Sequence, residues 1–303
     1  MVECSHPGFR EARRFGDTPI YKCDICGLFF NDKMNKNFDA KSLYNDYYKN
    51  EIGGRFSFGI EYLIRLFRFF RAFKIFTSYP GAKSILDIGS GRGFKLYYLK
   101  KYFKIRKAVG IQISKPACEF SRERLGLEII DKDFLDVQFG EEKFDIVTMM
   151  HVLEHVFNPE KYVKKIHSIL SDGGRLVIEV PNFNSWSSVL TGKYWLGLDL
   201  RYHVSYFTVD SLDRLLKKYN FKIKVLHTFS LEYSAFHSAQ SFSSLVTKTG
   251  HIFFNYIQKP EFSPMLIPQA LLFFAFLPFC FLINLFLYFS EKGEILFIVA
   301  EKD

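Results

Sequence analysis

The sequence predicts an α/β protein built on a doubly wound parallel sheet, and three observations support that fold class. First, short apolar runs alternate with amphipathic helical stretches from residue 84 onward. Apolar strands that alternate with helices are typical of parallel sheets buried on both faces. Second, a glycine-rich turn directly follows the first apolar run. Third, the 303 residues are 48% hydrophobic and 24% charged, which suits a chain that buries a large core.

The predicted elements follow one another along the chain in a regular order. Strands are expected at 84–89, 108–113, 127–131, 144–150, 175–180, 221–229 and 294–300. Helices are expected at 93–103, 116–125, 159–170 and 211–219, and the third begins with Asn158 as N-cap and Pro159 at the first helical position. We expect four regions: a cysteine-bearing module at 1–35, a helical connector at 36–80, an α/β core at 81–230 plus 291–303, and an apolar insertion at 231–290.

Residues 61–76 predict a further helix that is both basic and aromatic. A helical wheel puts its apolar side chains on one face and its basic side chains on the other, the apolar ones being Leu63, Leu66, Phe69, Phe70, Phe73 and Phe76 and the basic ones Arg65, Arg68, Arg71 and Lys74. One interpretation is a helix that covers the core and exposes its arginines. The other is an interfacial helix whose basic face suits anionic lipid.

The glycine-rich turn is the main candidate for a ligand-binding motif. It reads Asp87-Ile88-Gly89-Ser90-Gly91-Arg92-Gly93. Glycines let the backbone turn sharply from strand to helix and leave room for a ligand against bare main chain. The spacing differs from that of a dinucleotide-binding fingerprint.

This turn resembles motif I of the class I S-adenosylmethionine-dependent methyltransferases, with Asp87, Gly89, Gly91 and Gly93 at the motif positions. Residues 144–147, 151–155, 170–176 and 180–182 look like the block from the fourth to the fifth strand of that superfamily. The branch with a Leu-Glu-His element, which includes quinone-biosynthesis O-methyltransferases, is the most similar. The resemblance covers 83–229 and 294–301. It implies a Rossmann-like seven-stranded sheet whose last strand, at 294–300, is antiparallel.

The resemblance also implies where S-adenosylmethionine binds. Its methionine end is expected at Asp87, Gly89 and Gly91, where the carboxylate holds the ammonium or fixes the loop. Gln112 stands where an acidic residue usually holds the ribose, and its neutral amide can still form a hydrogen bond. The carboxylate of Asp133 is expected to accept from the adenine amine, with the ring of Phe134 packed on the base. The full expected set is Asp87, Gly89, Ser90, Gly91, Gly93, Gln112, Ile113, Asp133, Phe134 and Met150.

Methyl transfer to a hydroxyl benefits from a base, and four residues qualify by position. His151, Glu154 and His155 follow the fourth strand of the core, and His203 follows the fifth. Loops after the carboxyl ends of parallel strands face the ligand crevice, which favours His151 and His155. Each histidine can equally be a hydrogen-bonded structural residue. We therefore predict His151, His155 and His203 as candidates and leave the choice open.

The first 35 residues contain a pattern typical of a structural zinc site. Cys23 and Cys26 form a Cys-x-x-Cys pair followed by glycine, and the other half offers Cys4 and His6. The arrangement resembles N-terminal zinc knuckles that precede some sugar and cell-envelope methyltransferases. We expect a structural Zn²⁺ at Cys4, His6, Cys23 and Cys26. The alternative is a knuckle that has lost its metal.

The 29 residues from 262 to 290 carry no charge, and many of the 36 phenylalanines of the chain lie there or in the basic helix. An apolar stretch of this length is sufficient for a membrane span. However, the chain must return to the sheet if 294–300 is its last strand, and Pro268 and Pro278 interrupt the stretch. We therefore expect an interfacial or re-entrant helical hairpin. The alternative is a buried hairpin in a dimer interface or in a hydrophobic acceptor pocket.

Charge and targeting features complete the prediction. The net charge of +9 is spread along the chain, so no nucleic acid partner is expected. The N-terminal residues lack the apolar stretch of a signal peptide, and five cysteines is an odd number, which favours a cytoplasmic setting. We predict a methyltransferase, associated peripherally or monotopically with the membrane, that O-methylates a quinone, a glycolipid or a lipid-linked saccharide. A soluble small-molecule methyltransferase, with the insertion in a pocket or homodimer interface, and a non-catalytic methyltransferase-like subunit remain alternatives.

Overall fold

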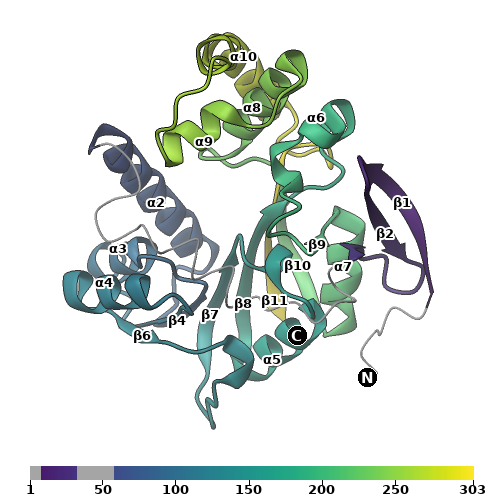
Figure 1. Ribbon diagram of the computed structural model, residues 1–303. Helices are drawn as coiled ribbons and strands as arrows, with labels where there is room; N and C mark the ends of the chain where they lie inside the picture. Colours follow the sequence, from purple (N-terminus) through teal and green to yellow (C-terminus); the bar gives the residue numbers. More distant parts are fainter. Residues whose placement is uncertain (1–7, 33–57) are drawn as a thin grey trace.

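The computed structural model describes residues 8–32 and 58–303, whose strands form two sheets (Figure 1). The larger sheet has the strand order β10-β11-β8-β7-β4-β5-β6. Its strands, in chain order, are β4 (Ser84–Ile88), β5 (Lys107–Ile111), β6 (Glu128–Ile130), β7 (Phe144–Met150), β8 (Leu170–Pro181), β10 (Phe221–His227) and β11 (Ile295–Lys302). Neighbours from β8 to β6 are parallel, whereas β11 is antiparallel to both β8 and β10. The predicted seven-stranded sheet with an antiparallel last strand is therefore confirmed.

Helices cover both faces of this sheet. On one face lie α2 (Phe58–Ser78), α3 (Phe94–Tyr102) and α4 (Lys115–Leu125), and on the other lie α5 (Pro159–Ile169) and α7 (Val209–Lys218) (Figure 1). Successive strand residues point to opposite faces, so Ile85 and Leu86 pack in different apolar clusters. Ile85 lies with α2 and α3, and Leu86 lies with α5 and α7. Two buried layers thus hold the sheet rigid between the helices.

A second, four-stranded sheet joins the N-terminal module to the core. It has the order β1-β2-β3-β9, where β1 (Phe9–Phe15), β2 (Thr18–Cys23) and β3 (Phe29–Asn31) belong to the module and β9 (Ser205–Tyr206) belongs to the core. Phe29 pairs with Tyr206 and Phe30 with Ser205. Among the described residues the module is thus continuous with the core rather than a separate unit.

Helix α2 confirms the helix expected at 61–76, but the side-chain orientation predicted for it is wrong. The basic side chain of Arg71 is buried, with 6% of its surface exposed, whereas Phe70 and Phe73 are about half exposed. Two carboxylates, Glu179 on β8 and Glu232 before α8, lie within ion-pair distance of Arg71 and hold it inward. The helical wheel could not show this, because the partners lie far away in the sequence.

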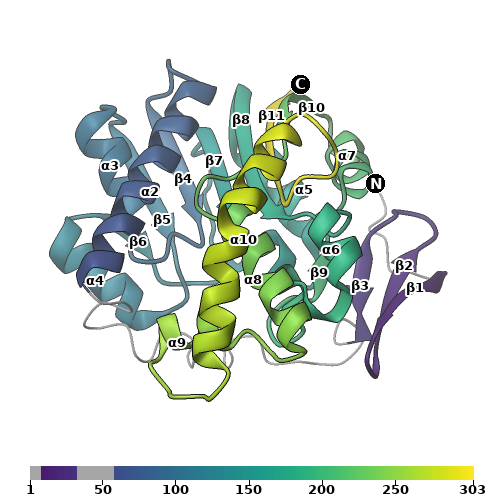
Figure 2. The ribbon, with the colours of Figure 1, turned by 90° about the horizontal axis from the view of Figure 1, so that it is seen from above.

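The apolar insertion forms three helices: α8 (Ser234–Thr247), α9 (Ile252–Gln258) and α10 (Leu266–Phe286). Figure 2 shows α10 lying over α8, between α2 and α6 (Trp186–Thr191). The expected break within 265–289 is wrong, since α10 is one continuous helix with Pro278 inside it. Pro268 stands in the first turn, where no backbone N–H is needed. Hydrogen bonds from Gln240 to Gln269 and from Asn284 to Ser238 fix α10 on α8.

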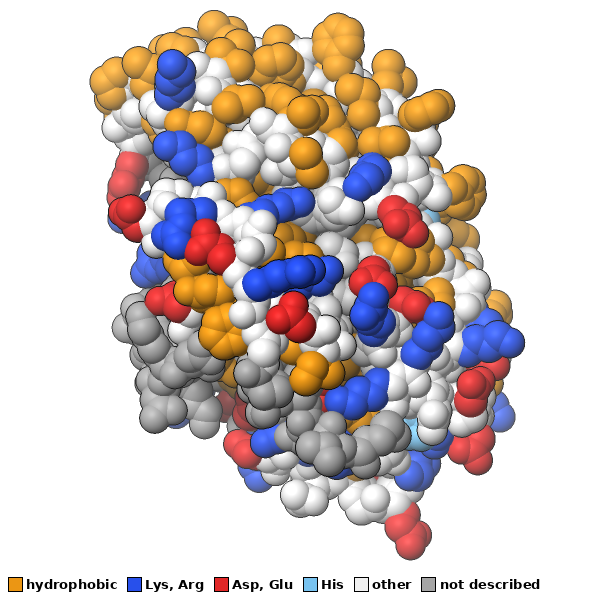
Figure 3. Space-filling view, turned by 90° about the vertical axis from the view of Figure 1, so that its right-hand side faces the viewer, with side chains coloured by type: hydrophobic (Ala, Val, Ile, Leu, Met, Phe, Trp, Pro, Cys, Tyr) orange, Lys and Arg blue, Asp and Glu red, His pale blue; other side chains and the backbone are white. Residues whose placement is uncertain are grey.

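One side of α10 is exposed. The helix is long and apolar enough to cross a membrane, and only 17% of its most apolar window is buried in the described structure. At and just after its carboxyl end, Phe286 and Phe289 are the most exposed of the large apolar side chains. Figure 3 shows hydrophobic side chains gathered over the end of the molecule where α10 lies, with charged side chains further away. The chain leaves the sheet after β10 and returns to it at β11, so both ends of the insertion lie at the sheet.

Candidate active site

The glycine turn between β4 and α3 adopts a conformation that requires glycine. Gly89, Gly91 and Gly93 all have positive φ angles, between 56° and 75°. A Cβ on Gly89 would lie 2.4 Å from Cγ2 of Val152, whereas a Cβ on Gly91 would meet nothing within 4 Å. The turn is therefore closed against the protein at Gly89 and open at Gly91. An open, side-chain-free turn at the carboxyl end of the first strand can take a ligand against its main chain.

Asp87 lies beneath the glycine turn. Its side chain is completely buried, and its Oδ1 accepts hydrogen bonds from Nζ of Lys95 at 2.7 Å and from the hydroxyl of Thr148 at 2.6 Å. Asp87 is also absent from the lining of the cavity described below. Its carboxylate thus anchors α3, through Lys95, to the sheet beneath the turn. Contact of Asp87 with the cofactor stays a prediction.

The residues predicted after the second and third strands do reach a common cavity. Gln112, Ile113, Asp133 and Phe134 all contribute to its lining. The side-chain oxygen of Gln112 accepts from the N–H groups of Ile113 and Ser114, which leaves its NH₂ group as the donor available to a ligand. The Asp133 carboxylate accepts from the N–H of Leu135 and from the hydroxyl of Tyr162.

Two predicted contacts of this set are not available. The Phe134 ring is 1% exposed and packs against Phe139 and Tyr162, so it is not free to stack on a base. Met150 is buried in the core beside α3 and does not line the cavity. The side chain of Phe134 packs toward α5, and the side chain of Met150 packs toward α3.

His151 is clamped between two carboxylates. Its Nδ1 lies 3.3 Å from Oε1 of Glu154 and its Nε2 lies 3.2 Å from Oε1 of Glu179. Burial alone would lower the pKa of His151, but these two carboxylates raise it to about 10. An imidazolium with both nitrogens engaged cannot accept a proton. This arrangement disfavours His151 as a base, and the role of His151 stays a prediction.

His155 and His203 meet across the cavity floor. Their rings lie 4.7 Å apart in an edge-to-face arrangement, although the residues are on different loops. Nδ1 of His155 lies 3.1 Å from the carbonyl oxygen of Tyr202, and Nδ1 of His203 lies 3.0 Å from that of Gly197. A carbonyl only accepts, so each Nδ1 carries a proton, and in the neutral ring the lone pair is on Nε2. Burial lowers the pKa of His155 to about 4.

Glu154 completes a group with these two histidines. One potential ligand atom from each of Glu154, His155 and His203 lies within 4.8 Å of the other two. Burial alone would raise the pKa of Glu154, but the hydrogen bond to His151 and the neighbouring histidines lower it to about 2. Its Oε2 is buried and has no hydrogen-bond partner in the described part of the chain. The sequence identified these three residues one by one but not as a cluster.

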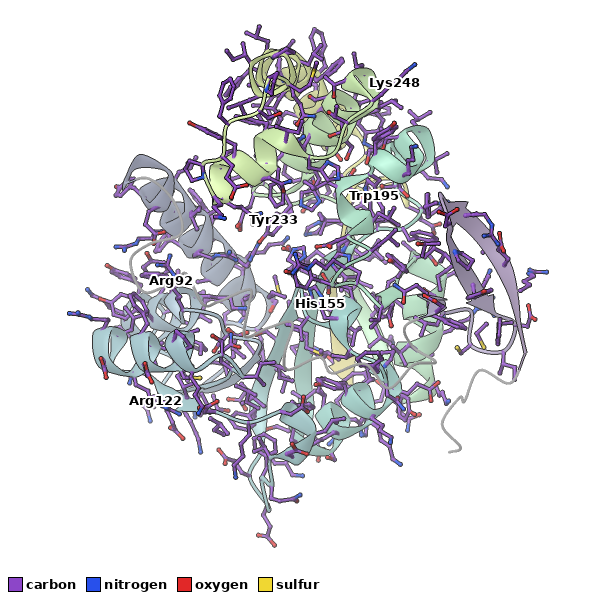
Figure 4. The ribbon with its side chains drawn as sticks, in the orientation of Figure 1. Arg92, Arg122, His155, Trp195, Tyr233 and Lys248 are labelled. Atoms are coloured by element: carbon purple, nitrogen blue, oxygen red, sulfur yellow. The ribbon has the colours of Figure 1, made fainter. Side chains whose placement is uncertain are left out.

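A cavity of about 1930 Å³ connects these features. Figure 4 shows His155 and Tyr233 directed toward the middle of the molecule, between the strand ends and the helices of the insertion. The polar end of the cavity contains Gly89, Gln112, Asp133 and the cluster Glu154, His155 and His203. Its other end is lined by apolar side chains from three helices, namely Leu63, Ile64 and Phe67 of α2, Phe253 and Phe254 of α9, and Phe273, Phe274, Leu277 and Phe281 of α10.

Residues that the prediction missed surround the cavity wall. Arg71 lies 3.1 Å from Glu179 and 2.7 Å from Glu232, and its guanidinium lies over the ring of Tyr233. His151 packs edge-to-face on the same ring. One signal was available: Glu179 is a charged residue that interrupts the apolar run from Leu176 to Val180 of a predicted strand. A buried carboxylate needs a partner, but the sequence does not say which one.

The expected zinc site lies partly outside the described residues. Cys23 ends β2 and is buried, and Cys26 lies in the following turn, half buried. A backbone hydrogen bond from Gly27 to Cys23 closes that turn at 3.0 Å. Cys4 and His6 fall in the undescribed segment 1–7. A structural zinc therefore stays a prediction, as does the composition of its ligand set.

The residues that face the cavity fit a bound S-adenosylmethionine. Gly89 brings the main chain of the turn to the cavity, Gln112 offers an amide donor, and Asp133 offers a carboxylate. These groups follow the ends of three successive parallel strands, β4, β5 and β6. Such strand ends form the ligand crevice of an open α/β sheet.

Comparison with known proteins agrees with this arrangement. Residues 61–226 match a family model described as a methyltransferase domain. An uncharacterized protein of Methanocaldococcus jannaschii is 26% identical over 148 residues, which are 48% of this chain and 69% of that protein. A ubiquinone biosynthesis O-methyltransferase of Coxiella burnetii is 27% identical over 34% of this chain and 45% of its own length. A ubiquinone biosynthesis O-methyltransferase of Histophilus somni is 29% identical over 38% of this chain and 52% of its own length. The matches thus span about half the length of these two enzymes.

Two solved structures share the fold. The plantazolicin methyltransferase BpumL, solved with a desmethyl plantazolicin analogue and SAH, aligns with a TM-score of 0.52 and 19% identity over 87% of this chain and 93% of its own. A SAM-dependent methyltransferase of Archaeoglobus fulgidus aligns with a TM-score of 0.50 and 20% identity over 86% of this chain and 99% of its own. At these identities the likeness concerns the fold.

Proposed function

The chain belongs to the class I S-adenosylmethionine-dependent methyltransferases, and from that premise we propose that it methylates an oxygen of a lipid-like or lipid-linked acceptor at a membrane surface. The bound cofactor supplies a methyl group on a sulfonium that is already a good leaving group. What this chain adds is alignment of the acceptor, exclusion of water and a place for the acceptor's proton. The Coxiella relative is named as an O-methyltransferase of ubiquinone biosynthesis, which supports oxygen as the methylated atom.

One observation carries the proposal: the cavity that contains the glycine turn extends to a helix whose other side is exposed and apolar. Phe273 and Phe281 of α10 line the cavity, while Phe279 and Phe286 of the same helix point outward. A long apolar group can therefore lie along the inner side of α10 with its polar end at the strand ends. Exposed apolar surface of this extent marks a membrane or protein contact.

A second exposed surface supports a membrane over a protein partner. Tyr62, Leu66, Phe70 and Phe73 of α2 are exposed, and Leu63 of the same helix both is exposed and lines the cavity. Helices α2 and α10 thus contribute side chains to the cavity and to the surface beside it. Insertion of both helices at the depth of the lipid headgroups would place the cavity entrance next to the acyl chains.

The polar end of the cavity suits a hydroxyl acceptor. His155 and His203 each direct a protonated Nδ1 to a backbone carbonyl, so their Nε2 atoms are the proton-accepting positions. His151 lies behind them and is held by Glu154 and Glu179. The two histidines that remain candidates therefore share one location, and we expect the acceptor's oxygen to lie there during transfer.

Transfer of labelled methyl groups tests the acceptor class. The purified chain is incubated with methyl-labelled S-adenosylmethionine and either a membrane-lipid extract or an aqueous metabolite extract. We expect the label in the organic phase with the lipid extract. Label confined to the aqueous phase would favour a soluble small-molecule methyltransferase. Calorimetry with S-adenosylhomocysteine accompanies the assay, because cofactor binding without transfer in either extract would favour a non-catalytic subunit.

Liposome flotation tests the membrane surface. In the variant Phe286→Ser/Phe289→Ser two outward side chains become polar without any change in the cavity lining. The matched control is Ile25→Ser/Val225→Ser, which alters two exposed apolar residues on the N-terminal module and on β10. We expect the control to float with anionic liposomes like the unmodified chain and the α10 variant to stay at the bottom. Equal behaviour of the two variants would contradict the membrane proposal.

A further inference from the structure

We propose that Glu154, His155 and His203 bind one divalent transition-metal cation, and that this cation holds the acceptor's oxygen during methyl transfer. This inference rests on the proposed function, since it assigns a task to the same end of the cavity. It adds a metal site that is separate from the cysteine module, because all three ligands lie in the core.

The first argument for a metal site is the hydrogen bonding of the two histidines. Both Nδ1–H groups donate to backbone carbonyls, of Tyr202 for His155 and of Gly197 for His203. Metal-ligating histidines typically have this second hydrogen bond, which fixes the ring orientation and directs the lone pair of the other nitrogen. The two rings lie 4.7 Å apart, so a ring nitrogen of each can approach one cation together with Glu154.

The second argument is the carboxylate of Glu154. Glu154 is 2% exposed, and its Oε1 already contacts His151. Its Oε2 is buried without a hydrogen-bond partner among the described residues, and a buried, unpartnered carboxylate oxygen is costly. Potential ligand atoms of Glu154, His155 and His203 converge within 4.8 Å of one another. A cation at the point of convergence would pair with the unpartnered Oε2 of Glu154.

His151 is not part of this ligand set, although it precedes Glu154 by one helical turn. Both of its ring nitrogens contact carboxylates, so neither offers a lone pair to a metal. Instead it neutralises part of the negative charge of Glu154 and Glu179. The third ligand, His203, comes from the loop before β9, and β3 of the N-terminal module holds that loop in place.

Two imidazoles and one carboxylate favour zinc, iron, cobalt or manganese over magnesium and calcium. The three protein ligands leave coordination positions on the cavity side for the acceptor. With the cation bound, the Nε2 lone pairs of both histidines are engaged, so the histidines hold the cation instead of taking the proton themselves. On binding, the acceptor's O–H bond breaks, its proton passes to water at the cavity entrance, and the oxygen stays on the cation as an oxyanion. The oxygen–methyl bond then forms while the methyl–sulfur bond breaks, and the electron pair of that bond remains on sulfur.

Cobalt titration of the full chain tests the site independently of activity. The parent for the titration is Cys23→Ser/Cys26→Ser, so that thiolates of the N-terminal module do not contribute. We expect this parent, freed of metal by a chelator, to bind one equivalent of Co²⁺ with a visible absorption band typical of nitrogen and oxygen ligands. In the same background His203→Ala should lose about tenfold or more in Co²⁺ affinity. His167→Ala, a histidine on α5 outside the cluster, is the matched control.

The outcomes separate this inference from the proposed function. Equal Co²⁺ affinity of His203→Ala and His167→Ala would overturn the metal site, as would full methyl transfer by the unmodified chain after chelation. Loss of transfer on chelation, with recovery on addition of Co²⁺ or Mn²⁺, would support it. If His203→Ala does not fold, His203→Asn replaces it, with folding checked by circular dichroism. Failure of transfer to every extract would count against the proposed function, whereas the Co²⁺ titration stands by itself.

Discussion

Two histidines four positions apart, His151 and His155, have pKa values shifted in opposite directions, His151 upward and His155 downward. Carboxylates contact both nitrogens of His151 and keep it charged, whereas His155 donates to a backbone carbonyl and is buried as a neutral ring. The sequence presents both as equal candidates for a base. Their difference arises from Glu179, which is 28 residues away from His151. At the scale of single residues, the partner determines the chemistry more than the residue type does.

His227 gives a pH-dependent stability that can be measured. Its ring stacks between Tyr288 and Phe297, and its Nδ1 accepts from the N–H of Phe229. Burial, with Lys74 nearby, lowers the pKa of His227 in the folded state to about 3. The unfolded chain therefore binds one more proton than the folded chain between about pH 6.5 and 3. The stability that the neutral ring provides is complete above pH 6.5 and is lost as the pH falls.

We expect the unfolding free energy to fall by about 1.4 kcal/mol for each pH unit below 6.5 on account of His227. Phe at this position keeps the stacking and cannot be protonated. Urea denaturation of the unmodified chain and of His227→Phe at pH 7.5 and pH 5 measures the difference. The variant should lose less stability between the two pH values, and an equal loss in both would contradict the assignment.

At the scale of elements, α2 and α10 show what periodicity predicts and what it omits. Both helices form where the sequence predicts helical or apolar structure, because local patterns determine where a helix begins and ends. The buried face of α2 was predicted the wrong way round, because carboxylates on β8 and before α8 draw Arg71 inward. Helix α10 continues through Pro278, and packing on α8 supports it. Tertiary contacts thus override a pattern that is only local.

The short strand β3 links the N-terminal module to the candidate active site. Asn31, which is 1% exposed, donates from its side chain to the carbonyl oxygen of His203 at 2.7 Å, and its N–H donates to the carbonyl of Val204. The module thus holds the loop that carries His203. The sequence placed these two segments in separate regions, more than 170 residues apart.

We predict that Asn31→Leu lowers kcat for methyl transfer about tenfold and leaves the affinity for S-adenosylhomocysteine unchanged. Leucine has a similar size, but it removes the amide donor of the buried carbonyl of His203 and leaves only the longer hydrogen bond from the Tyr206 hydroxyl, at a cost of about 1–3 kcal/mol. Steady-state kinetics and calorimetry measure the two quantities. Glu11→Ala, an exposed change on β1 of the same sheet, serves as the control. A loss of cofactor affinity as large as the loss of kcat would argue against a local effect on His203.

At the scale of the whole molecule, one buried charge network joins three separate parts of the chain. Arg71 of α2 contacts Glu179 of β8 and Glu232 of the insertion, and Lys74 lies 4.0 Å from Glu179. Burial disfavours the charged guanidinium, but the carboxylates of Glu232 and Glu179 raise the pKa of Arg71. The network therefore fixes α2 and the insertion against the sheet on either side of the cavity.

Removal of Arg71 should be strongly destabilising. Arg71→Met leaves Glu179 and Glu232 without their shared guanidinium, and loss of one partner of a buried ion pair costs about 3–5 kcal/mol. Adding Glu232→Gln should recover part of that loss, because it removes one of the two carboxylate charges that Arg71 neutralised. Arg65→Met, on the exposed side of the same helix, should cost about 1 kcal/mol or less. Equal costs for the two single variants in urea denaturation would contradict this account.

The sequence by itself determined the α/β fold, the order of the strands, the glycine turn and the class of the enzyme, because all of these depend on periodicity and on short contiguous motifs. Only the tertiary structure decided which charges are buried, that Asp87 lies beneath the turn, and that the apolar insertion lines the same cavity as the glycine turn. It also decided that Glu154, His155 and His203 form one cluster. These features depend on contacts between segments distant along the chain, whose free energy comes from burial and pairing that local sequence does not encode.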